Sequence, residues 1–183
     1  MNHVKRIIAI LIVFGPMVVH AAPIMCQDIN NNHVIIDASQ VASCFDAGTG
    51  NISGNPMTDQ FLLNGGTAAG YSLVSKDDGS NPFNIMTSQS GDSGTWSIDP
   101  SFWLTNTGGA IGFKFGTGNK PDEWFVFELI SGGSSGDWDF ENVFGRGGGL
   151  SHTNLYAVPE PGTLALFGIG LAAMGLARRK KKA

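Results

Sequence analysis

The chain has 183 residues, of which 26 are glycine, and its formal net charge is −4. Between residues 22 and 161 it carries 15 acidic and four basic residues, which gives this stretch a net charge of −11. Such an acidic body argues against binding to nucleic acid or anionic lipid, and it suits a soluble secreted protein that could use divalent cations. The length allows one domain with a sizeable core.

The first 21 residues have the pattern of a secretory signal peptide, with a basic region followed by an apolar core at 7–19. We predict cleavage between Ala21 and Ala22, because cutting one residue later would place Pro23 directly after the cut. The domain that follows the signal peptide is therefore expected outside the cytoplasm.

The two cysteines, Cys26 and Cys44, form an isolated even pair in a chain expected to be exported. Exported proteins fold in oxidising compartments, so we predict one disulfide between them. A metal site would need more ligands than two cysteines 18 residues apart provide. In the chain-entropy description, a bridge of this span stabilises the fold by about 3 kcal/mol.

The middle of the chain has few helix formers, and its short apolar runs are separated by clusters of glycine, asparagine and serine. This pattern predicts strands and turns. The expected strands are 34–37, 71–75, 83–87, 94–99, 110–116, 123–130 and 151–157. Residues 44–64 are expected to form a loop, with 61–63 as a candidate strand or anchor. Together these features predict an all-β, antiparallel β-sandwich of jelly-roll type over residues 22–157.

The clearest signal comes from 110–116, where Ile111, Phe113 and Phe115 fall on one face of a strand. The run 123–130 is apolar on both faces over most of its length, which is typical of a central strand. Turn-forming residues separate the two runs, so we expect an antiparallel pair.

Residues 91–94, Gly-Asp-Ser-Gly, are similar to the nucleophile motif of chymotrypsin-like proteases. The triad of those enzymes needs a histidine base upstream of the serine. Upstream of Ser93, the mature chain offers only His33, which lies within the expected disulfide loop. We therefore interpret this segment as a β-turn.

Asp137, Asp139, Glu141 and Asn142 could supply oxygen ligands to Ca²⁺, but their spacing does not match the helix–loop–helix calcium motif. A solvated acidic loop is the preferred interpretation, and no metal is assigned.

His152 has no paired carboxylate nearby in sequence, so we expect a structural or surface histidine. Trp103, Trp124 and Trp138 could stack on sugar rings, although aromatic residues of a sandwich belong more often to the core. Histidine is scarce and no carboxylate pair stands out by its spacing, which argues against an enzyme.

The last 26 residues, 158–183, contain a Pro-Glu-Pro motif at 159–161. Pro159 and Pro161 restrict φ and lack an amide hydrogen. We therefore expect this segment to be extended, to join neither helix nor sheet, and to present Glu160 to solvent.

The apolar run 164–177 follows and predicts a single transmembrane helix, although its 14 residues would span only ~21 Å. The chain then ends in a basic stop that is expected to stay on the cytoplasmic side of a membrane. This stop consists of Arg178, Arg179, Lys180, Lys181 and Lys182.

Motif, apolar run and basic end together resemble the PEP-CTERM sorting signal of Gram-negative bacteria. Pro159, Glu160 and Pro161 match the motif of that family, and Arg178 with Arg179 match its basic end. The resemblance implies that an exosortase, a membrane protease-transpeptidase, processes the chain at or near the motif.

The same resemblance implies a cell-surface or extracellular-matrix protein, anchored in the inner membrane before processing and associated with exopolysaccharide and biofilm. The part before the signal looks like ectodomains common among PEP-CTERM substrates, which implies a sandwich but no activity. We expect no enzymatic activity, no cofactor and no nucleic-acid partner. The alternative is a carbohydrate-binding module or a polysaccharide-active enzyme on a jelly-roll fold.

Overall fold

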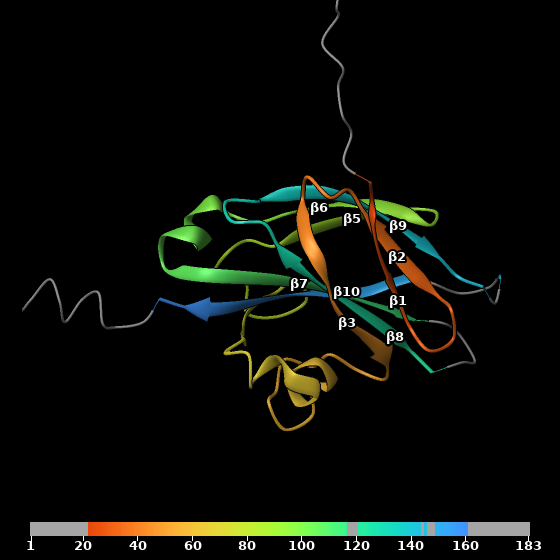
Figure 1. The fold of residues 1–183 in the computed structure, drawn as a ribbon, viewed down its shortest axis with the longest axis horizontal. Coiled ribbons are helices and arrows are strands. Elements are labelled where there is room, and N and C mark those ends of the chain that lie inside the picture. Colours follow the sequence, from red (N-terminus) through yellow and green to blue (C-terminus); the bar gives the residue numbers. More distant parts are fainter. Residues whose placement is uncertain (1–21, 117–120, 144, 146–148, 161–183) are drawn as a thin grey trace, which may run out of the picture.

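The computed structural model describes residues 22–116, 121–143, 145 and 149–160. These residues form two five-stranded antiparallel sheets (Figure 1). Sheet A has the strand order β1-β2-β9-β6-β5, and sheet B has the order β3-β8-β7-β10-β4. The all-β prediction is confirmed.

The strands of sheet A are β1 (Ile24–Gln27), β2 (His33–Ile36), β5 (Met86–Ser90), β6 (Ser93–Ser97) and β9 (Ser135–Glu141). The strands of sheet B are β3 (Val41–Thr49), β4 (Ser72–Lys76), β7 (Asn106–Gly116), β8 (Glu123–Leu129) and β10 (Gly149–Pro159). Two short helical segments, η1 (Leu62–Gly66) and η2 (Pro100–Leu104), lie in the connections.

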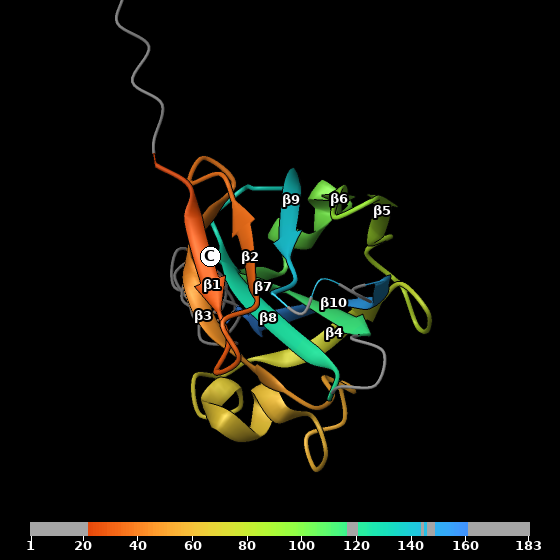
Figure 2. The same ribbon diagram turned by 90° about the vertical axis from the view of Figure 1, so that its right-hand side faces the viewer.

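The two sheets share one hydrophobic core, to which strands of both contribute buried side chains. Phe115 of β7 stacks on Phe140 of β9, with ring centroids 4.0 Å apart. Phe113 of β7 lies 6.0 Å from Trp138 of β9 by the same measure. In Figure 2 the strands β9, β6 and β5 accordingly lie above β8, β10 and β4. The predicted antiparallel pairing of the runs 110–116 and 123–130 is confirmed, as β7 with β8.

A second core covers the opposite face of sheet B. The segment between β3 and β4, which contains η1, lies on the side of sheet B away from sheet A (Figure 1). Phe61 of this segment packs on Tyr156 of β10, and Trp124 and Val126 of β8 belong to the same cluster. This cover explains why the β8 sequence is apolar on both faces. Residues 61–63 therefore act as an anchor, not as a strand.

The predicted disulfide is confirmed, because Cys26 is bonded to Cys44. Cys26 lies on β1 at the edge of sheet A, and Cys44 lies on β3 at the edge of sheet B. The bridge therefore joins the two sheets to each other.

Three sequence predictions need correction. The stretch 44–64 is not all loop, because β3 continues to Thr49 and pairs with β8 through two register shifts. The acidic residues 137–141 do not form a loop, because they belong to β9, where exposed acidic positions alternate with buried Trp138 and Phe140. The strand expected at 83–87 lies at Met86–Ser90, and β1 was not predicted.

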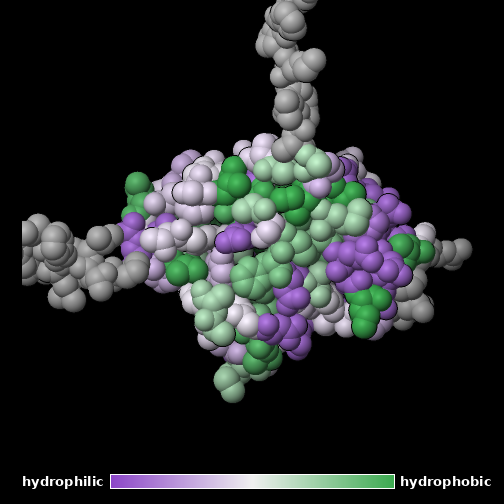
Figure 3. All heavy atoms as spheres, in the orientation of Figure 1, coloured by the Kyte–Doolittle hydropathy of each residue, from purple (hydrophilic) through white to green (hydrophobic). Residues whose placement is uncertain are grey.

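Large apolar side chains also occur on the surface, but they are distributed over different elements. The face shown in Figure 3 is a mosaic of hydrophilic and hydrophobic residues. Among the described residues, the exposed ones of this kind are Met25, Ile29, Met57, Leu63, Met86, Leu104 and Val143.

Candidate processing site at the end of the last strand

The strand β10 carries the chain to the start of the Pro-Glu-Pro motif. It lies between β7 and β4 in sheet B. Its pairing with β7 continues to the end of the strand, where Pro159 lies opposite Asn106. Its pairing with β4 ends earlier, where Ala157 lies opposite Ser72. In Figure 1 this end of β10 is the blue arrowhead at the left.

Pro159 is thus part of sheet B, and the expectation that the motif joins no sheet is wrong for this residue. Proline is tolerated where one side of a strand lacks a partner, because its missing amide hydrogen then breaks no ladder bond. The neighbouring strand β4 has already ended at this level. The ladder with β7 is also irregular here, with a register shift between Val158 and Pro159.

Glu160 is the first residue after the strand, and it is exposed as predicted. Its backbone N–H donates a hydrogen bond to the carbonyl oxygen of Thr105, at 3.1 Å. The hydroxyl of Thr107 donates to the carbonyl oxygen of Val158, at 3.3 Å. The acidic residue of the motif is therefore held at a defined edge of the fold, with its side chain accessible to a partner.

The rest of the predicted sorting signal lies outside the described residues. This holds for Pro161, for the apolar run 164–177 and for the basic stop 178–182, and also for the signal peptide 1–21. Within the part of the chain that the structure describes, no helix has the length and apolar character needed to cross a bilayer.

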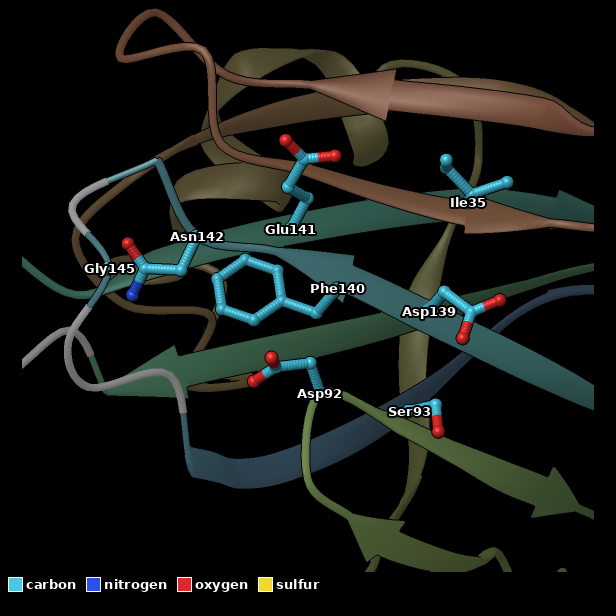
Figure 4. Close-up of a pocket in the computed structure, with 8 residues that line it drawn as sticks. All are labelled: Ile35, Asp92, Ser93, Asp139, Phe140, Glu141, Asn142 and Gly145. Carbon is cyan, nitrogen blue, oxygen red and sulfur yellow. The ribbon is translucent and has the colours of Figure 1, made fainter.

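A hollow of about 460 Å³ lies on sheet A, between β2, β9 and the β5–β6 hairpin. Asp92, Asp139 and Glu141 line it, and Figure 4 shows their carboxylates pointing in different directions. Glu141 also pairs with the imidazole of His33, at 3.2 Å. Among the described residues, no three His, Cys, Asp or Glu side chains form a group that could hold a metal. The described residues of the hollow therefore do not form a group of metal ligands.

The segment Gly-Asp-Ser-Gly is a hairpin turn, as interpreted from the sequence. Ser90 pairs with Ser93, and Gly91 and Asp92 form the two-residue loop between β5 and β6. Gly91 has a φ of 65°, which glycine adopts without strain.

His152 is a buried structural histidine. Its Nε2 lies 2.9 Å from the carbonyl oxygen of Ile52, in the segment that covers sheet B. Burial is the main cause that lowers its pKa from the ordinary value, so it remains neutral near pH 7.

Two of the three tryptophans considered for sugar stacking, Trp124 and Trp138, are 1% exposed and belong to the cores. Trp103 is partly buried, and its indole N–H donates to the carbonyl oxygen of Gly133, at 2.8 Å. The structure thus favours the core interpretation for these side chains.

A pair of buried carboxylates was missed by the sequence analysis. Glu123, the first residue of β8, is 0% exposed, and Asp28, in the β1–β2 turn, is 5% exposed. Glu123 Oε1 accepts from the side-chain amides of Asn32, at 2.5 Å, and Asn30, at 3.3 Å. Burial first, and the negative charge of Asp28 second, raise the pKa of Glu123 to about 7. The sequence does contain a signal for half of this pair, because Asp or Asn occupies every second position from 28 to 32. Glu123 could not be connected with this turn, because it is distant in sequence.

Comparison with known proteins gives one match. Residues 157–181 match the family model described as "PEP-CTERM protein-sorting motif". No curated protein and no solved structure matches the chain. The match overlaps the last residues of β10 and includes the complete Pro-Glu-Pro motif. A motif of this family marks a secreted protein with a membrane-anchored sorting signal that is directed to an exosortase.

Proposed function

We propose that the chain is a non-enzymatic extracellular protein whose sorting signal is removed by an exosortase at or near Pro159, Glu160 and Pro161. Before this step, residues 164–177 hold the protein in the inner membrane, and the basic residues 178–182 stay in the cytoplasm. After it, the domain is delivered to the cell surface or the extracellular matrix. The association with exopolysaccharide and biofilm rests on the family resemblance.

One observation carries this proposal. The matched sorting motif starts within the last strand of the folded domain, and its acidic residue, Glu160, is exposed directly after the strand. Its position close to the apolar run suits an enzyme that works at the membrane surface. A soluble protease would be crowded there by the bilayer and the domain together.

The fold supports a role outside the cytoplasm. A disulfide joins the two sheets, and such bonds persist in oxidising compartments. We assign the paired sheets to a jelly-roll-like β-sandwich because the chain passes repeatedly between them, for instance from β2 to β3 and from β8 to β9. This architecture gives a rigid domain for display.

The test replaces Glu160 by Ala in a host that carries the cognate exosortase. We expect normal export but blocked maturation, so that the protein accumulates in the inner membrane with its full tail. Asp139→Ala is the matched control, because it also removes an exposed carboxylate, but from β9. Normal trimming of the Glu160→Ala protein would overturn the assigned sorting role of this residue.

A further inference from the structure

The pair of Asp28 and Glu123 lies at the other end of the molecule from the processing site. Glu123 is opposite Phe115 near the end of β7, whereas Pro159 is opposite Asn106 at its start. At about 3.4 Å per residue, these two levels are roughly 30 Å apart. An inference about the carboxylate pair is therefore independent of the processing of the chain.

Within the described part of the chain, neither carboxylate is paired with a positive side chain. Glu123 Oε2 and Asp28 Oδ2 are buried, and no other described residue donates a hydrogen bond to them. The basic residue on the neighbouring strand, Lys114, pairs with Asp122 instead. A buried carboxylate without a counter-charge is strongly unfavourable. A proton or a bound cation at this pair would remove that cost.

The turn that carries Asp28 has the ligand spacing of a cation site. Asp28, Asn30 and Asn32 repeat the Asp-x-Asn-x-Asn order of the first three ligands in the helix–loop–helix calcium motif. The later glycine and glutamate of that motif are absent here. Glu123 brings in the missing carboxylate from β8, across the gap between the sheets.

The hydrogen bonds leave one oxygen of each carboxylate for a ligand. Asp28 Oδ1 accepts from the backbone N–H groups of Asn30 and Asn32, both at 2.9 Å, so that Oδ2 is left over. Asn32 is fixed at both ends of its amide, because its Oδ1 also accepts from the N–H of Val143, at 2.7 Å. It is a positioning residue that holds Glu123 in place.

We propose that this carboxylate pair binds Ca²⁺ through Asp28 Oδ2, Glu123 Oε2 and the side-chain oxygen of Asn30. Asn30 is partly exposed, and its one contact to Glu123 is long, so a rotation of its amide can turn the oxygen inward. Ca²⁺ takes six to eight oxygen ligands in flexible geometry, and water and backbone carbonyls complete this number. Mg²⁺ demands regular octahedral geometry and fits this irregular set less well.

The bound ion would join the same two sheets as the disulfide. Asp28 follows Cys26 by two residues on the sheet A side, and Glu123 begins a strand of sheet B. With two charged ligands, the expected dissociation constant is about 10⁻⁴ to 10⁻³ M, the range of extracellular calcium modules. At 10 mM Ca²⁺ this raises the ratio of folded to unfolded protein by roughly 10- to 100-fold.

The test uses the full exported chain, purified in detergent at pH 7.5. Tb³⁺ is the luminescent probe, because Trp124 is adjacent to Glu123 in sequence and can sensitise it. We expect Tb³⁺ emission that Ca²⁺ displaces, and a melting temperature that 10 mM Ca²⁺ raises clearly more than 10 mM Mg²⁺ does. If Ca²⁺ leaves the melting temperature of the wild type unchanged, the pair is neutralised by a proton and the proposal fails.

Variants separate this site from other acidic groups. Glu123→Gln and Asp28→Asn should weaken Ca²⁺ binding at least tenfold, while Asp139→Asn on the exposed face of β9 should not change it. Asn30→Asp adds a negative charge at the side chain that we expect to rotate towards the ion, so it should tighten Ca²⁺ binding. A purely structural role of the turn does not predict tighter binding. Retained affinity in Glu123→Gln, or an unchanged affinity in Asn30→Asp, would overturn the proposal. If Glu123→Gln fails to fold, the Asn30→Asp result decides.

Discussion

Removal of the disulfide should lower the stability of the domain by a predictable amount. The perturbation is the double variant Cys26→Ala and Cys44→Ala, or reduction of the wild type. The bridge spans 18 residues of sequence. The loop-closure entropy of that span corresponds to about 3 kcal/mol at 25 °C. Because domains are stable by only about 5–15 kcal/mol, this loss is a large share of the total.

The assay is urea unfolding of residues 22–160 with and without a reductant. Without the disulfide, we expect unfolding at a lower urea concentration and, in a thermal scan, a melting temperature lower by roughly 10 °C. Maleimide labelling of the native, unreduced protein should find no free thiol. If the bond is shown to be broken and the midpoint does not move, the entropic reasoning is refuted. If Cys26 and Cys44 are both labelled without reductant, the bridge itself is wrong.

Three further predictions concern the buried carboxylate, the second core and the strand end. The pKa of Glu123 is raised in the fold from 4.5 to about 7, so its contribution to stability is full below pH ~4.5 and is lost as the pH rises towards 7. In EDTA, the free energy of unfolding of the wild type should therefore fall by about 3 kcal/mol relative to that of Glu123→Gln between pH 4.5 and 7.5, as measured by urea unfolding. Equal pH profiles of the two proteins would contradict this. In the same assay, Phe61→Ala should lower the free energy of unfolding by about 3–5 kcal/mol, because Phe61 is buried in the second core. Leu63→Ala, at an exposed position, should lower it by less than about 0.5 kcal/mol. Similar losses in the two variants would argue against the second core. A Gly-Ser-Gly-Ser insertion between Val158 and Pro159 should speed trimming in a pulse-chase experiment, because it separates the motif from β7, and an unchanged rate would show that the strand end does not limit the enzyme.

Strands with strong apolar patterns could be predicted from the sequence, whereas the edge strands β1 and β3 were missed. The alternation of Ile111, Phe113 and Phe115 identified β7 because one face of this strand lies in the main core. By contrast, β3 is an edge strand with mostly partly exposed residues and two register shifts, so its sequence lacks a clear period. In β9, exposed Asp137 and Asp139 alternate with buried Trp138 and Phe140, and this pattern identifies a strand only once the two aspartates are known to face solvent.

At the candidate sites, local signals succeeded and distant ones failed. The Pro-Glu-Pro motif and the cysteine pair could be identified because their meaning depends on a short segment or on pairing by elimination. The inclusion of Pro159 in sheet B depends on where β4 ends, which no local pattern reports. The approach of Glu123 to Asp28 depends on how the two sheets pack, so the sequence offered only half of that pair.

The central claim is that the C-terminal signal is removed after export, and the most direct measurement is intact-mass spectrometry of the protein from native cells. We expect a mature chain that starts at Ala22 and ends at or near residues 159–161, without the apolar run 164–177. A mature protein that retains the chain through Lys182 and Ala183 would contradict it.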